Sequence, residues 1–183
     1  MVLYFDTETT GLTPGRIIQL SYILESENKT VGKNFYFNVD FIPEDSIKIH
    51  GITLEKLSVL SKGKTFLDYV NEIEKDFSSA EKIVAHNLSF DVNFLNSEFE
   101  RLDKKFTYKN GLDSMRYFTP ILKLMRKSGG YKFPKLVEVA DYYDVKKEEV
   151  LSVCNRLFKS DGNDFHDARF DAVTLYLSMK KSN

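Results

Sequence analysis

The order of strand-like and helix-like segments constrains the fold of this chain more than any other feature of its sequence. Runs rich in β-branched and aromatic residues come first, and hydrophobic residues at helical spacing occupy most of the rest. The predicted strands are Val2–Asp6, Ile17–Leu24, Val31–Val39 and Lys82–Ala85, with Leu112 ending a short fifth. The predicted helices are 54–60, 66–77, 89–102, 114–126, 135–142, 147–158 and 166–181, and the predicted turns are 10–15 and 161–164. This order predicts an α/β fold in which helices flank a mixed sheet.

Length and composition indicate one domain that covers residues 1–183. The 183 residues include 26 basic and 27 acidic side chains, for a net charge of −1. This balance excludes a strongly basic nucleic-acid coat protein, so binding to a polyanion needs a local basic patch. The single cysteine, Cys154, excludes an internal disulfide framework and a cysteine-cluster metal site. Because we find neither a secretory leader nor an apolar run of membrane-spanning length, we expect a cytoplasmic protein with no membrane partner.

The first candidate site is Asp6-Thr7-Glu8-Thr9-Thr10-Gly11, at the end of the first predicted strand. Side chains alternate across a strand, so Asp6 and Glu8 point to the same side. Two neighbouring carboxylates repel each other, and a divalent cation between them removes that repulsion. The alternative for this motif alone is a solvated strand end that leads into a threonine-rich turn.

Two further motifs place carboxylates near helix starts. In His86-Asn87-Leu88-Ser89-Phe90-Asp91, the last residue falls in the first helical turn, where the helix dipole favours an anion. In His166-Asp167-Ala168-Arg169-Phe170-Asp171, the histidine must precede the helix to meet Asp171, because residues five apart lie about 140° from each other around a helix. Taken singly, both motifs also fit ordinary charges at helix N-termini, with Ser89 or Asn87 as a cap and Asp167 paired with Asp171.

Together, these motifs resemble the DEDDh 3′-to-5′ exonucleases, the family of the proofreading epsilon subunit of bacterial DNA polymerase III. The Asp-x-Glu-Thr-Thr-Gly, His-Asn-x-x-Phe-Asp and His-x-Ala-x-x-Asp motifs occur in the family's order. Lys48–Thr53 resembles an epsilon-like segment after the third strand, although a glycine turn before a helix capped by Thr53 is the plainer alternative. Two positions depart from the family pattern. Gln19 stands where relatives often have an acidic residue, and Asp167 stands where a basic residue is frequent. The resemblance implies a ribonuclease H-like fold, with a mixed five-stranded sheet and helices on both sides.

The resemblance also implies the catalytic residues and the cofactors. Two Mg²⁺ or Mn²⁺ ions would be held by Asp6, Glu8, Asp91 and Asp171. Two metals can stabilise charge on the attacking and the leaving oxygen of a phosphodiester. His166 would act as the general base, since imidazole suits proton transfer near neutral pH.

The implied substrate is a polynucleotide 3′ end, which would be bound beside these carboxylates. The resemblance places Thr9, Thr10, Gly11 and Leu12 against the terminal nucleotide. Further candidates for the same pocket are His50, Asn87 and Phe90, although Phe90 equally fits a helix core.

A basic segment offers a second region for nucleic-acid binding. Residues 114–137 include six basic side chains and no acid, with Tyr131 and Phe133 among them. Lysines on phosphates and rings under bases suit a single strand, and we expect Lys127 and Lys132 to contact it. The alternative is a solvated helix face with core aromatics.

Three functional hypotheses follow from the sequence. The first is a metal-dependent 3′-5′ exonuclease that acts on single-stranded DNA ends in proofreading or repair. The second is an exonuclease that trims RNA 3′ ends, since the same catalytic residues serve RNA-directed relatives. The third is a polymerase-associated subunit that serves mainly assembly. The intact catalytic set argues against the third, because clustered carboxylates without a metal would repel each other.

Overall fold

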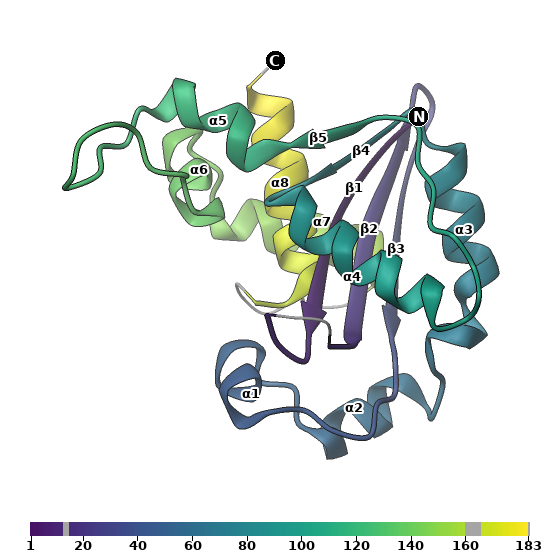
Figure 1. Cartoon of the computed structure of the whole chain (residues 1–183). Helices are drawn as coiled ribbons and strands as arrows, with labels where there is room; N and C mark the ends of the chain where they lie inside the picture. The colour runs from purple at the N-terminus through teal and green to yellow at the C-terminus, as the bar shows by residue number, and fades with distance from the viewer. Residues whose placement is uncertain (13–14, 160–165, 183) are drawn as a thin grey trace.

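A mixed five-stranded sheet forms the centre of the computed structural model, which describes residues 1–12, 15–159 and 166–182 (Figure 1). Its strands are β1 (Val2–Thr9), β2 (Ile17–Ser26), β3 (Lys29–Tyr36), β4 (Lys82–Ala85) and β5 (Gly111–Asp113). They lie in the order β3-β2-β1-β4-β5. β1 pairs antiparallel with β2 and parallel with β4, which makes the sheet mixed and confirms the predicted fold class. Residues 13–14 of one predicted turn, and the whole of the turn at 161–164, lie outside the described residues.

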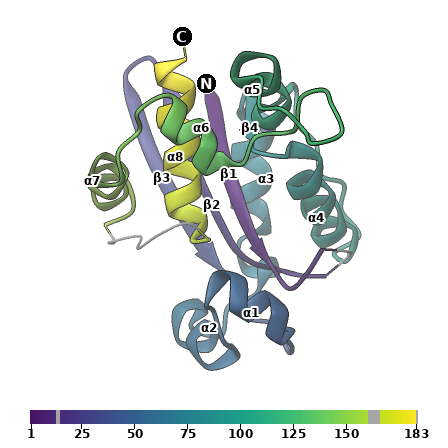
Figure 2. The ribbon, with the colours of Figure 1, turned by 90° about the vertical axis from the view of Figure 1, so that its left-hand side faces the viewer.

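Helices cover both faces of this sheet (Figure 2). α3 (Val70–Ser79) and α4 (Leu88–Glu100) pack on one face, and α8 (Ala168–Lys181) packs on the other. The remaining helices on the α8 side are α5 (Ser114–Leu122), α6 (Leu136–Tyr142) and α7 (Lys147–Phe158). At the end of the sheet where β1 finishes lie α1 (Glu44–His50) and α2 (Leu54–Ser61), followed by the 3₁₀ turn η1 (Phe66–Asp68).

Side-chain alternation along β1 decides where the candidate carboxylates lie. Leu3 and Phe5 join the apolar core beneath α3 and α4, whereas Tyr4 joins the core beneath α8. Asp6 and Glu8 continue the series of Tyr4 and therefore lie on the α8 face. Thr7 lies on the opposite face, toward α4.

Several helices differ from the sequence-based expectation. The sequence analysis does not predict α1, which packs beside a third apolar cluster formed by Ile18, Val39, Ile42, Ile52 and Leu57. The helix predicted over 114–126 ends at Leu122, because Lys123 adopts a left-handed φ of 51°. The helix predicted over 66–77 is divided into η1 and α3. In the described ranges, no helix combines the length and apolar character needed to cross a bilayer.

Candidate active site

Three carboxylates from two distant segments meet near the end of β1. One oxygen each from Asp6, Glu8 and Asp171 lies within 4.8 Å of the other two. The first two residues come from β1, while Asp171 comes from the first turn of α8. Carboxylate oxygens are the donors that Mg²⁺ and Mn²⁺ prefer, so this group fits a divalent cation.

Without a cation, these carboxyl groups resist ionisation. Burial, followed by the charges of Asp171, Asp167 and Asp91, raises the pKa of Glu8 to about 9. Burial and then Asp171 raise the pKa of Asp6 well above its ordinary value. A bound cation favours the ionised form of each carboxyl group, so the arrangement is suited to holding metal.

Asp91, the fourth predicted carboxylate, lies outside this group of three. It is 2% exposed, and its Oδ1 accepts a 2.7 Å hydrogen bond from the Thr7 hydroxyl on the α4 face. Burial raises the pKa of Asp91 to about 7, although the bond from Thr7 opposes this shift. Its charge contributes to the raised pKa of Asp6, so the two carboxyl groups are near enough to interact.

His166 lies directly before α8, as it must if it is to meet Asp171. Its backbone N–H donates to Asp171 Oδ2 at 3.1 Å, and its φ of 69° turns the chain into the helix. Asp167 occupies the N-cap position and accepts a bond from the Arg169 N–H at 3.0 Å. His166 is exposed, and its backbone therefore lies beside Asp171 at the edge of the carboxylate group.

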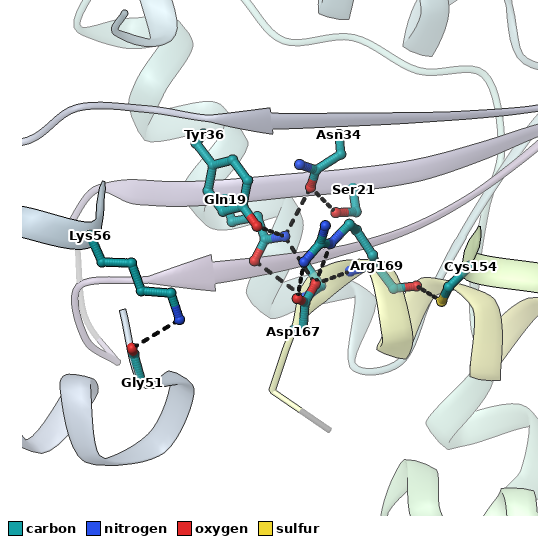
Figure 3. Close-up of polar contacts among 10 residues, drawn as sticks. Gln19, Ser21, Asn34, Tyr36, Gly51, Lys56, Cys154, Asp167 and Arg169 are labelled. Carbon is teal, nitrogen blue, oxygen red and sulfur yellow. Dashed lines mark hydrogen bonds and ion pairs between the residues drawn. The ribbon is translucent and has the colours of Figure 1, made fainter. Parts of the chain in front are cut away.

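A buried polar network fastens the first turn of α8 to the sheet (Figure 3). Gln19, paired with Glu8 in the β1–β2 register, is 0% exposed, and its Nε2 donates to Asp167 Oδ1 at 3.1 Å. Its Oε1 accepts from the Ala168 N–H at 3.4 Å. Arg169 Nε donates to the same Asp167 oxygen at 2.9 Å. The two departures from the family pattern thus contact each other, and an arginine that the sequence analysis overlooked pairs with the added carboxylate.

The first cleft has a volume of about 420 Å³ and opens beside Glu8. Leu12 is 84% exposed and forms part of its wall, as does Ile49, which the sequence analysis did not predict. Six of the residues predicted to bind the terminal nucleotide line this cleft: Thr9, Thr10, Gly11, Leu12, His50 and Phe90.

His50, which lines this first cleft, has a neutral imidazole ring near neutral pH. The Ile52 N–H donates to its Nδ1 at 3.0 Å, so Nε2 carries the proton of the neutral ring. Burial, then the charges of His166 and Lys56, lower the pKa of His50 to about 4. Nε2 is buried and has no hydrogen-bond partner in the described part of the chain.

The second cleft has a volume of about 630 Å³ and is lined by His166 and Asp171. Asn87 lines this cleft rather than the first one. Because Glu8 lines the first cleft and Asp171 the second, the carboxylate group lies where the two clefts meet. The other residues of the second cleft are His86, Met115, Phe133, Pro134, Lys135, Leu136 and Val137.

The two predicted phosphate-binding lysines lie in the loop between α5 and α6, which projects to the left in Figure 1. Lys132 forms an ion pair with Glu138, and Lys127 lies in the turn that the Gly129 N–H closes on the Arg126 carbonyl at 3.1 Å. Within the described residues, neither lysine lines either cleft, whereas Lys135 lines the second.

Solved structures of exonuclease I resemble this fold. The E. coli exonuclease I complex with a dA16 oligonucleotide superimposes with a TM-score of 0.71 at 19% identity. The match covers 98% of this chain and 40% of that one, so the chain spans well under half of the larger enzyme. Apo exonuclease I gives a TM-score of 0.70, also at 19% identity. At this identity the likeness shows the fold, which is ribonuclease H-like.

Sequence comparison identifies the family. The epsilon subunit of DNA polymerase III from Rickettsia felis is 31% identical over 182 residues, which cover 94% of this chain and 69% of the relative. The epsilon subunit from Rickettsia conorii is 36% identical, with the same coverage of both chains. Residues 3–150 match the RNase T family model, described as exonuclease. These matches confirm the resemblance seen in the motifs: the chain belongs to the exonuclease family and is a phosphodiester-hydrolysing enzyme.

Proposed function

We propose that residues 1–183 form one exonuclease domain that removes nucleotides from DNA 3′ ends in proofreading or repair. In this proposal, Asp6, Glu8, Asp91 and Asp171 hold two Mg²⁺ or Mn²⁺ ions, and His166 is the general base. The observation that carries it is the meeting of three carboxylates from β1 and α8 at the junction of two clefts, with His166 beside them.

The donor set supports the metals. Asp6, Glu8 and Asp171 supply only carboxylate oxygens, and burial raises the pKa of Glu8 to about 9 unless a cation offsets the repulsion. Asp91 would help to hold the second ion if its Oδ1, which accepts a hydrogen bond from Thr7, bound the metal instead. When bound, the ions supply charge stabilisation to the attacking and leaving oxygens.

The chain's own residues then have defined tasks. His166 accepts a proton from the attacking water, whose oxygen forms a bond to the phosphorus of the last phosphodiester. The bond from that phosphorus to O3′ of the preceding nucleotide breaks, and the leaving oxygen takes up a proton from solvent. A nucleoside 5′-monophosphate departs, and the strand keeps a new 3′-hydroxyl. A positioned base of this kind contributes about 10²–10⁴-fold to the rate.

The first cleft is the proposed site of the terminal nucleoside. Its apolar wall, formed by Leu12, Ile49 and Phe90, suits a base and a sugar, and the neutral His50 suits a hydroxyl or phosphate oxygen. The relatives named as epsilon subunits favour DNA as the substrate and a DNA polymerase as a candidate partner. This role also fits the cytoplasmic location expected from the sequence.

A time course on matched 5′-labelled single-stranded DNA and RNA tests the proposal. We expect a ladder that shortens from the 3′ end with Mg²⁺ or Mn²⁺, and no products with EDTA. His166→Ala should lower the rate by about 10²–10⁴-fold, and wild-type DNA cleavage should be faster than RNA cleavage.

The possible outcomes separate the hypotheses. Faster RNA cleavage would replace DNA by RNA as the substrate. Shortening from the 5′ end, or an unchanged rate in His166→Ala, would remove the proposed polarity or the proposed base. If a folded, Mn²⁺-binding protein degraded neither strand, the chain would instead act as an assembly subunit.

A further inference from the structure

A buried glutamate of α4 takes no part in the proposed chemistry. Glu98 is 1% exposed, and glutamate is rarely buried to this extent unless it is paired, because its charge loses free energy on leaving water. Its Oε1 accepts from Arg16 Nε at 2.8 Å and from the Ile17 N–H at 3.0 Å. Arg101 Nη1 lies 3.5 Å from the same oxygen. One buried oxygen therefore joins α4 to the start of β2.

The bond from Glu98 falls at an irregularity of the sheet. The register of β1 and β2 shifts between Glu8 and Thr9, which makes Ile18 an extra residue on β2. A bulge of this kind bends its strand, redirects side chains and interrupts the ladder of backbone hydrogen bonds. Glu98 accepts from the N–H of the neighbouring Ile17 and so holds the bulge from the α4 side.

Further hydrogen bonds fasten the described ends of the β1–β2 loop to the same glutamate. The Thr10 N–H donates to the Arg16 carbonyl at 2.9 Å, and the Arg16 N–H donates to the Thr10 hydroxyl at 2.8 Å. Arg101 Nη2 donates to the Gly15 carbonyl at 2.9 Å. Because Arg16 and Arg101 both contact Glu98, the two ends of the loop are joined to each other and to α4.

Both walls of the first cleft depend on this bulge and loop. One wall is formed by residues 9–12, which directly follow the register shift and include the 84% exposed Leu12. The other wall is formed largely by α1. Ile18 packs in the third apolar cluster with Ile42 and Ile52, which lie on either side of α1 in the sequence. The bulge therefore connects the two walls that face each other across the cleft.

We propose that Glu98 is a positioning residue for substrate binding: through the bulge and the β1–β2 loop, it keeps the first cleft in the shape that receives the 3′ end. The inference rests on the proposed function, because it takes the first cleft as the site of the terminal nucleoside. A wall that is ordered in advance lowers the entropy cost of binding. Asp6, Glu8 and Asp171 belong to β1 and α8, so metal binding does not require the bonds to Glu98.

Two substitutions of Glu98 separate its acceptor oxygen from its bulk. Glu98→Met removes the acceptor with little change in volume. We expect it to raise the KM for a labelled oligothymidylate about tenfold and to change kcat less, because the loop must then be ordered when substrate binds. Glu98→Gln keeps an oxygen that can accept from the Ile17 N–H, so its KM should stay near that of the wild type. Titration with Mn²⁺ should give the same Kd for all three proteins.

Arg16→Met and Asp76→Leu complete the design. The Arg16 side chain is 39% exposed, so Arg16→Met should fold, and it should raise KM by a smaller factor than Glu98→Met. Asp76→Leu is the matched control for lost stability. Asp76 accepts from the Tyr22 hydroxyl at 2.7 Å and from Lys33 Nζ at 2.6 Å, and among the described residues it lines neither cleft. Asp76→Leu should lower the free energy of unfolding and leave KM unchanged.

Amide hydrogen exchange measured by NMR reports on these bonds without substrate. In Glu98→Met, the amides of Thr10 and Ile17 should exchange faster than in the wild type, because the bulge and the loop open locally. The amide of Leu20, within β2, should keep its wild-type rate. Uniformly faster exchange would indicate a general loss of stability and would overturn the proposed local role.

The kinetic results decide the proposal. An unchanged KM in Glu98→Met, a Glu98→Gln variant as impaired as Glu98→Met, or weaker Mn²⁺ binding would overturn it. If Glu98→Met does not fold, an unchanged KM in Arg16→Met would do so. If the wild type hydrolysed no strand, the proposed function would fail. Fluorescence anisotropy of the labelled oligothymidylate would then test Glu98 alone, and equal binding by wild type and Glu98→Met would reject the inference.

Discussion

The other acidic groups of the site all raise the pKa of Asp6. Its pKa is raised by burial and then by Asp171, Asp91, Glu8 and Asp167 in turn. We expect Asp6→Asn to keep the local shape, remove one metal-binding charge and lower hydrolysis by on the order of 10³-fold, as large electrostatic losses in active sites do. Titration with Mn²⁺ should show weaker binding. Asp103→Asn, an exposed change at a left-handed residue, is the control and should retain activity; full activity in Asp6→Asn would refute the metal assignment.

His50 gives a residue-scale prediction about pH. Burial lowers its pKa to about 4 from an ordinary value near 6.5, so the folded protein disfavours the protonated ring. Its contribution to stability is therefore present above about pH 6.5 and lost as pH falls through about 4. Relative to His50→Asn, the wild type should lose free energy of unfolding across this range. Urea unfolding at a series of pH values measures the difference, and parallel pH curves for the two proteins would contradict the prediction.

At the scale of elements, the attachment of α8 to β2 controls the geometry of the site. Gln19 bonds both Asp167 and the Ala168 N–H, while His166 and Asp171 depend on the same helix start. Gln19→Leu should lower the free energy of unfolding by about 1–3 kcal/mol, because it leaves buried polar groups without this partner. It should also lower kcat more than it raises KM, since the base and one carboxylate shift together.

Tyr36→Phe is a milder change in the same network and serves as the comparison for Gln19→Leu. It removes only the hydroxyl that accepts from Gln19 Nε2 at 3.2 Å, and leaves the bonds to α8 in place. Its loss in both stability and kcat should be smaller than that of Gln19→Leu. Equal losses, or a stable Gln19→Leu variant with unchanged kcat, would show that the network does not position the helix.

The sequence predicts most elements because their patterns are local and long. The strand alternation of Phe35, Phe37 and Val39 continues in the buried positions of the structure, even though β3 ends at Tyr36. α1 is missed because a helix of seven residues has little periodicity, although Pro43 before it and Gly51 at its end are boundary signals. The contact between Gln19 and Asp167 joins residues 148 positions apart, so it depends on strand register and helix packing that no local pattern reports.

The candidate site, like the fold, can be predicted from the sequence where the pattern is local, and not where it depends on packing. Short motifs with fixed spacing locate Asp6, Glu8 and Asp171, which the structure brings together. The second cleft cannot be predicted from local patterns, because its residues come from the end of β4, α5, the start of α6 and the start of α8. One of its histidines, His86, is held by the Ser114 hydroxyl and the Pro134 carbonyl. The basic segment 114–137 does contain Phe133 and Lys135, which line the second cleft. Charge alone, however, favours Lys127 and Lys132 as the nucleic-acid-binding residues.

At the scale of the whole molecule, the carboxylate group couples metal binding to pH and stability. The raised pKa values of Glu8, about 9, and Asp91, about 7, mean that the folded protein holds more protons than the unfolded chain between about pH 4 and pH 9. The contribution of these groups to stability is therefore present at low pH and declines as pH rises through this window. A divalent cation must displace those protons, so its affinity should increase over the same range.

The resulting prediction concerns Tm with and without Mn²⁺. A cation at 100 times its Kd stabilises a folded protein by about 2.7 kcal/mol, and the lower Kd at higher pH enlarges this effect. We expect Mn²⁺ to raise Tm more at about pH 8 than at about pH 6, because fewer protons then compete for the carboxylates. Asp6→Asn should reduce the Mn²⁺ shift at both pH values, whereas Asp103→Asn should not. A shift of equal size at the two pH values would mean that the cation binds away from this group, and the assignment of its ligands would then be wrong.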